Sequence, residues 1–119
     1  MGSHEDGLRH RMGAAHERDL AVLLGGRQTR GSGNQFADQM DGRHDPYDDL
    51  ALAWDCKSTR SNSVGVSKRM WEKALEQAHG ARPILPIRFY GSDRLDIELD
   101  LVVASLNDFV EILDRARRP

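Results

Sequence analysis

Apolar residues alternate with small and charged ones over residues 50–57, LALAWDCK. Every second residue from Leu50 to Cys56 is apolar, a spacing typical of a β-strand with one buried face. The other face carries small residues and then Asp55 and Lys57, whose side chains point to the same side because they are two positions apart. A strand with a buried pattern therefore presents a carboxylate and an ammonium group side by side.

Helical periodicity predicts helices over residues 14–24, 68–80 and 107–118. Further strands are expected at the beginning of residues 27–35, near residues 40–43, and over 83–91 and 96–106. The alternation of strands and helices predicts a single α/β domain, with a central mixed β-sheet flanked by helices in the order αβββαββα.

Two details of this pattern make specific predictions. Pro86 interrupts the strand over 83–91, which indicates either an edge position or a local irregularity. The last helix is expected to turn Phe109, Ile112, Leu113 and Ala116 inward.

The length of 119 residues fits one domain. Residues 1–13, MGSHEDGLRHRMG, are polar and contain glycine, so we expect disorder there and the folded domain over 14–119. No apolar run is long enough to cross a membrane. The single cysteine excludes an internal disulfide and fits a reducing, cytoplasmic compartment.

Charge is unevenly distributed although the net charge is only -2. Residues 38–55 contain six aspartates and one arginine, whereas residues 56–94 contain eight Lys or Arg and three acidic residues. An acidic cluster followed by a basic stretch would suit a metal site beside a groove for a polyanion. The alternative is an ordinary solvated surface of mixed charge.

Asp41 and Asp55 could hold a metal ion from neighbouring strands, with Lys57 on the same side to orient a water or stabilise charge on a phosphate. Glu17 lies at the edge of the apolar stripe of the first helix, where a carboxylate needs a partner or a cation. Oxygen ligands suit Mg²⁺. The alternative for Glu17 is a favourable interaction with the helix dipole, and the five histidines lack zinc-ligand spacing.

The chain resembles the PD-(D/E)xK nuclease superfamily and, within it, the archaeal and phage Holliday-junction resolvases. The resemblance covers roughly residues 14–90 and rests on an ordered set of segments. These are Glu17 in the first helix, RGSG at 30–33, the aspartate of MDGR, WDCKST at 54–59, the basic helix and the strand ILPIRFY.

The resemblance implies a restriction-endonuclease-like fold and a homodimeric phosphodiesterase that cuts four-way DNA junctions with Mg²⁺, for which Mn²⁺ can substitute. Glu17, Asp41 and Asp55 match the acidic ligands, completed by the backbone carbonyl of Cys56, and Lys57 matches the catalytic lysine. Ser32 matches the serine near the scissile phosphate. The expected DNA contacts are Arg30, Ser32, Arg60, Lys68, Arg69 and Lys73.

Two departures from the family pattern leave alternatives open. The carboxylate before x-Lys is usually Glu, and here it is the shorter Asp55; Asp45, Asp48 and Asp49 are rivals of Asp41. A less selective or restriction-type nuclease, a non-catalytic DNA-binding module, and an α/β domain with ordinary salt bridges around Lys57 are competing interpretations. An intracellular location, in a bacterial host if the chain is phage-encoded, follows from the resemblance.

Overall fold

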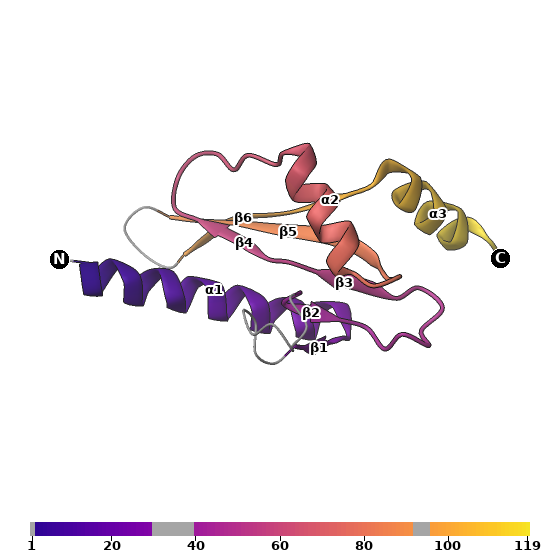
Figure 1. The fold of residues 1–119 in the computed structure, drawn as a ribbon, viewed down its shortest axis with the longest axis horizontal. Helices are drawn as coiled ribbons and strands as arrows, with labels where there is room; N and C mark the ends of the chain where they lie inside the picture. Colours follow the sequence, from indigo (N-terminus) through magenta and orange to yellow (C-terminus); the bar gives the residue numbers. More distant parts are fainter. Residues whose placement is uncertain (1, 30–39, 92–95) are drawn as a thin grey trace.

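The computed structural model describes residues 2–29, 40–91 and 96–119, which form three helices and a mixed six-stranded sheet (Figure 1). The elements in chain order are α1 (Gly2–Leu24), β1 (Arg27–Gln28), β2 (Gly42–Arg43), β3 (Leu52–Trp54), β4 (Lys57–Thr59), α2 (Lys68–Gln77), β5 (Arg82–Tyr90), β6 (Ile97–Ala104) and α3 (Leu106–Arg117). The expected α/β class and the order of its elements are confirmed, with one strand divided in two.

The divided strand is the one that alternates over residues 50–57. β3 and β4 both pair in parallel with β5. Leu52 is paired with Arg82 and Lys57 with Ile87, so the separation in sequence between paired residues is the same in both strands. The two strands are therefore one line of chain, interrupted at residues 55–56 without a change of register.

Pro86 explains the interruption. The amide of Arg82 donates to Ala51 and the carbonyl of Ile84 accepts from Asp55, so the even-numbered residues of β5 bond toward β3 and β4. Pro86 is next in this series and has no N–H, so the ladder is broken opposite Cys56. The predicted irregularity is present, but the alternative of an edge position is wrong, because β5 lies between β3 and β4 on one side and β6 on the other.

The first helix is longer than its apolar pattern indicates. It begins at Gly2 and not near residue 14, so the disorder expected for residues 1–13 is replaced by helix over the described part of that segment. Its end at Leu24 agrees with the sequence, and Gly25 adopts the left-handed conformation that glycine allows at a helix end (φ 66°).

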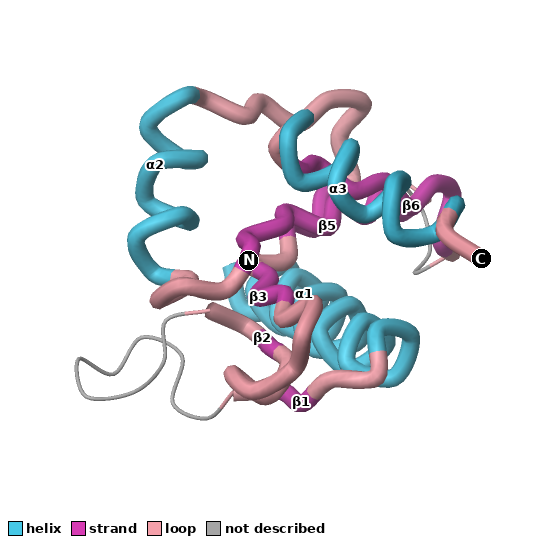
Figure 2. Tube along the Cα trace, turned by 90° about the vertical axis from the view of Figure 1, so that its right-hand side faces the viewer, coloured by secondary structure: helices cyan, strands magenta, loops and turns pink. Residues whose placement is uncertain are grey.

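The helices α1 and α2 lie on opposite faces of the sheet (Figures 1 and 2). On the α1 face, Leu20 packs with Trp54 and Ile84; on the α2 face, Ala53 packs with Ala78 and Met40. This assignment places Asp55 and Lys57, which share the parity of Ala53, on the α2 face. Residues of the candidate site thus lie on a sheet that is covered from both sides.

The space around Trp54 depends on two glycines. A methyl group added at Gly42 would lie 2.2 Å from Nε1 of the fully buried indole, and one added at Gly26 would lie 2.2 Å from its Cη2. His44 contacts the same ring edge to face, at 5.4 Å between ring centroids. The indole therefore fixes how closely β2 and the end of α1 approach β3.

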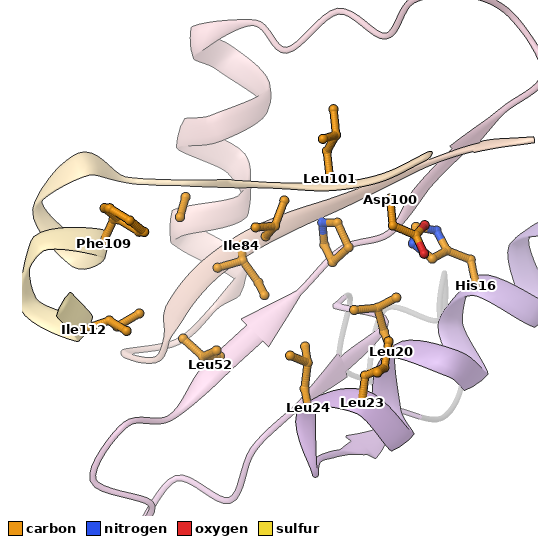
Figure 3. Close-up of a pocket in the computed structure, with 13 residues that line it drawn as sticks. His16, Leu20, Leu23, Leu24, Leu52, Ile84, Asp100, Leu101, Phe109 and Ile112 are labelled. Atoms are coloured by element: carbon orange, nitrogen blue, oxygen red, sulfur yellow. The ribbon is translucent and has the colours of Figure 1, made fainter. Parts of the chain in front are cut away.

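The last helix does not pack as its pattern predicts. No residue of α3 is buried, and Phe109 is 55% and Leu113 37% exposed. The helix lies past the end of β6 (Figure 1), and its Phe109 and Ile112 point toward the sheet across a cavity (Figure 3), so its apolar side is turned inward but is not closely covered. Among the described residues, no helix is long and apolar enough to span a lipid bilayer.

Candidate active site

Asp55 and Lys57 contact each other directly. The Nζ of Lys57 lies 2.9 Å from Oδ2 of Asp55, and the two side chains are 33% and 26% exposed, respectively. The pair sits at the interruption between β3 and β4, where Pro86 of β5 has no N–H to donate to the carbonyl of Asp55. The juxtaposition indicated by the alternating pattern is therefore present, at a break in the sheet that remains accessible to solvent.

Asp41 approaches the same point from the neighbouring strand. Its amide donates to the carbonyl of Trp54 (2.8 Å), and its carboxylate Oδ2 accepts from the amide of Cys56 (2.7 Å). The N–H and C=O of one residue in an extended chain lie on the same edge, so the carbonyl of Cys56 is on the edge that Asp41 occupies. β2 begins at Gly42, directly after Asp41, so the edge of β4 beyond this point is not paired with β2.

The carboxylates influence one another strongly. Burial and a side-chain hydrogen bond with Glu17 raise the pKa of Asp41 to about 8, and the charges of Glu17 and Asp55 act in the same direction. The hydrogen bond from Cys56 opposes this rise but does not overcome it. Burial and the same three carboxylates also raise the pKa of the Cys56 thiol, which is therefore a core side chain and not a nucleophile.

Glu17, Asp41 and Asp55 are thus neighbours, although they come from α1, the β2 border and the strand break. Their side chains do not converge on one point: in the described ranges, no group of three or more His, Cys, Asp or Glu is placed to hold a metal ion. Asp55 is turned toward Lys57, and Glu17 and Asp41 are held together by a hydrogen bond.

The donor chemistry nonetheless fits a hard cation. The nearby groups are carboxylate oxygens and a backbone carbonyl, which are the ligands that Mg²⁺ takes in proteins. The raised pKa of Asp41 favours its protonated form, which offsets the repulsion between carboxylates in the way that a divalent ion would offset it when bound.

The rival aspartates lie in other contacts. Asp45 accepts from the amide of Tyr47, and Asp48 accepts from the amide of Leu50, as expected of turn residues. Asp49 pairs with Arg115 of α3 at 2.8 Å. None of the three is among the charges that shift the pKa of Asp41, so the structure brings Asp41 to Asp55 and leaves the rivals in the connecting turn.

The predicted DNA contacts divide into two groups. Arg30 and Ser32 lie outside the described residues. The other four are exposed, at the end of the β4 segment and on α2: Arg60, Lys68, Arg69 and Lys73. Ser67 caps α2, with its hydroxyl accepting from the amide of Met70 (3.0 Å).

A second charged cluster was not found from the sequence. Arg88 of β5 is almost fully buried and forms ion pairs of 2.7 Å with Asp19 of α1 and Asp100 of β6. It also lies 5.8 Å from the ring centre of Tyr90. The signal available in the sequence was a lone arginine in the apolar strand ILPIRFY, which requires a buried partner.

His16 lies beside this second cluster and contacts the active-site strand. Its Nδ1 is 2.9 Å from Oγ of Ser58, which follows Lys57 directly. Burial and the positive charge of Arg88 lower the pKa of His16 to about 4, so the ring is neutral near neutral pH. His44, likewise, accepts from the amide of Leu52 and bonds the carbonyl of Leu24, so its ring nitrogens are engaged in structural contacts.

Comparison of this chain with protein-family models, with curated protein sequences and with solved structures gave no match. The candidate site therefore rests on the chain's own residues and geometry.

Proposed function

We propose that this chain is a metal-dependent endonuclease that hydrolyses phosphodiester bonds in DNA, with four-way junctions as its substrate. One observation carries the proposal: Asp41, Glu17 and Asp55 gather beside Lys57 at a break in the sheet. An ordinary salt bridge between Asp55 and Lys57 would not require two further carboxylates nearby, one of them with a raised pKa. Clusters of this kind in an accessible position favour a functional role.

The chain's own groups have distinct roles in this proposal. The amide of Cys56 fixes the orientation of the Asp41 carboxylate, and Asp55 holds the Lys57 ammonium near the acidic group. Lys57 can stabilise negative charge that develops on a phosphate, or hold and release a proton of the attacking water. Its partial exposure leaves it accessible to a backbone phosphate.

Glu17, Asp41, Asp55 and the carbonyl of Cys56 would hold the Mg²⁺ ion, and Mn²⁺ can take its place. When bound, the metal supplies Lewis-acid activation of a phosphate oxygen and a more acidic water. Binding requires Asp41 to lose the proton that its raised pKa retains, and Asp55 to turn from Lys57.

Arg60, Lys68, Arg69 and Lys73 are the proposed phosphate contacts around this site. They are exposed, so DNA can reach them without a rearrangement of the core. The choice of a four-way junction, and of a homodimer that offers one site to each of two strands, is supported by the resemblance to the resolvases. Arg30 and Ser32 belong to the same proposal.

The test compares end-labelled four-way junction, linear duplex and single strand of the same sequence, each incubated with the protein and Mg²⁺. Symmetric cuts in the junction alone are expected. Asp55→Asn should slow cleavage by about 100-fold or more, while junction binding measured in Ca²⁺ is retained.

Asp48→Asn is the matched control, because it makes the same chemical change in the turn and its amide oxygen can still accept from Leu50. It should cleave at the wild-type rate. Equal cutting of all three substrates would mean that the substrate is DNA in general and not the four-way junction. Full activity of Asp55→Asn, or junction binding without any cleavage by the wild-type protein, would overturn the proposed active site.

A further inference from the structure

The strand β6 has an unusual position for its sequence. It is eight residues long, and among the described strands it pairs with β5 alone, so it forms an edge of the sheet. Its apolar residues are nevertheless exposed on both faces: Leu99 and Leu101 are each 48% and Val102 is 60% exposed. Near-continuous apolar strands are typical of the interior of a sheet, and exposed apolar edges invite pairing with another strand.

The free edge of β6 can be identified from the register. Because even-numbered residues of β5 bond toward β3 and β4, the odd-numbered ones bond toward β6, opposite Leu99, Leu101 and Val103. The backbone groups of Asp100 and Val102 therefore face outward. The register shift near Phe89 and Tyr90 lies at the beginning of β6, so the strand is regular from Leu99 onward.

An apolar surface adjoins this edge. The pocket beside it has a volume of about 260 Å³ and is formed between α1, β5, β6 and α3 (Figure 3). Its lining includes Leu24, Val102, Phe109 and Ile112. In Figure 3, Asp100 points toward His16 on this side of β6, whereas Leu101 points to the other side.

The exposed apolar side chains near this edge lie on both faces of the sheet, with Leu99 and Leu101 on one face and Val102 on the other. The large apolar side chains of β6, α3 and the end of α1 that are more than one-third exposed are Val22, Leu23, Ile97, Leu99, Leu101, Val102, Leu106, Phe109, Val110 and Leu113. At roughly 100 Å² each, they expose on the order of 1,000 Å², compared with about 800 Å² per partner in a standard interface. Monomeric proteins rarely leave so much apolar surface in contact with water.

We propose that a second copy of this chain occupies the surface, with the two β6 strands paired antiparallel about a two-fold axis at Leu101. A two-fold axis pairs the same strand with itself, so one sequence satisfies both sides of the edge. The sheets of the two copies then form one continuous sheet.

The charges disfavour an axis at Asp100, and the length of β6 disfavours an axis at Val102, which would pair only residues 100–104 of the strand. Residues that face each other across an antiparallel pair must lie on the same face of the sheet, which leaves only axes that pass through a residue. An axis at Asp100 would place two like carboxylates opposite each other, which is destabilising. The axis at Leu101 instead places Asp100 opposite Val102 of the partner subunit and brings the two Leu101 side chains together.

A homodimer is already part of the proposed function, and this inference adds where the two copies meet; that position is argued from the sheet edge and not from the nuclease activity. A monomer that cuts junctions would overturn the interface and leave the activity. A dimer that cuts no DNA would overturn the activity and leave the interface.

The first experiment measures the mass of the full chain in solution by sedimentation equilibrium at micromolar concentration. The wild type should be a dimer, and Leu101→Lys should halve the apparent mass, because it places two ammonium groups at the axis. Leu75→Lys is the control: Leu75 is a similarly exposed leucine (56%) on α2, away from β6, and this variant should remain dimeric. A monomeric wild type, or a dimeric Leu101→Lys variant, would overturn the proposal.

The second experiment tests the register in a Cys56→Ala background. Leu101→Cys should form an intermolecular disulfide on air oxidation, because paired residues of adjacent strands lie within disulfide range. Leu99→Cys, equally exposed and on the same face of β6, should cross-link far less, because it would face Val103 of the partner subunit. Cross-linking through Leu99→Cys that equals or exceeds that through Leu101→Cys would overturn the axis at Leu101.

Discussion

The two charged clusters on this sheet differ in one respect. The cluster around Arg88 contains its own cation, and the guanidinium contacts carboxylates from α1 and β6. Among the described residues, the cluster around Asp41 brings together three carboxylates, and the cation paired with it is Lys57, which contacts Asp55. A charge-balanced cluster ties elements together, whereas an excess of buried carboxylate costs stability that only a proton or an added cation can offset.

The largest change should follow from removing the cation of the balanced cluster. Arg88→Met leaves Asp19 and Asp100 facing each other with no positive charge, and we expect the free energy of unfolding to fall by about 3 kcal/mol. The value is at the low end for a buried pair because the two carboxylates are partly exposed and regain water. Urea denaturation measures it.

Arg82→Met is the control for this loss. Arg82 lies on the same strand, and two of its guanidinium nitrogens donate to the carboxylate of Glu111. The Arg82 side chain is more exposed than that of Arg88. A smaller loss is expected, because exposed pairs contribute little. Equal losses in the two variants would mean that burial of Arg88 does not decide its importance.

Neutralising one carboxylate of the Asp41 cluster should instead raise the free energy of unfolding. Asp41 has a pKa above that of the unfolded chain, so the folded state holds the proton more tightly, and stability falls as the pH rises from about 4 to about 8. Asp41→Asn removes this dependence while its amide oxygen can still accept from Cys56. Near pH 9 and without metal, the variant should be more stable than the wild type by on the order of 2 kcal/mol, after allowance for solvent screening.

The measurement is urea denaturation of both proteins in a chelator, at about pH 5 and about pH 9. The difference between them should be small at the lower pH and large at the higher one. If the difference in free energy of unfolding between the wild type and Asp41→Asn were the same at both pH values, Asp41 would not be destabilised by the neighbouring carboxylates.

A divalent cation should act on the same cluster. Mg²⁺ or Ca²⁺ at ten times its dissociation constant should stabilise the wild type by about 1.4 kcal/mol, because it binds only the folded protein. Thermal unfolding detects this without any DNA or activity. Asp41→Asn should lose the effect and Asp48→Asn should keep it; equal stabilisation of all three would place the ion elsewhere.

The smallest expected effect concerns the basic residues near the acidic cluster. Replacement of Lys68 and Arg69 by alanine should weaken junction binding at any sequence and reduce the log–log salt slope by roughly one to two units. Lys68 also lies 3.9 Å from Glu72, but this pair is highly exposed and its loss should not unfold α2. Superimposable salt plots, measured in Ca²⁺ to prevent cleavage, would mean that this helix does not contact DNA.

The sequence by itself determined the α/β class, the order of the elements and the pairing of Asp55 with Lys57. These features depend on periodicity and on neighbours in the chain, which short-range spacing encodes. It also indicated an irregularity at Pro86, because the missing N–H is a property of the residue itself.

Only the tertiary structure decided which aspartate joins Asp55. The sequence favoured Asp41 but left Asp45, Asp48 and Asp49 as rivals, and the pairing of β2 with β3 separates the first from the other three. The Arg88 cluster likewise required the alignment of α1, β5 and β6, whose partners are far apart in the sequence.

The same limit explains the error at the C-terminal end. Helical periodicity identifies an apolar side in Phe109, Ile112 and Leu113, but it does not identify what covers that side. In the structure, α3 lies past the end of the sheet and β6 remains at its edge, so Phe109 and Leu113 are left exposed and Ile112 is only half-buried. A pattern in one chain records that a surface should be buried, whereas the element that buries it is set by the arrangement in space, which can include a second chain.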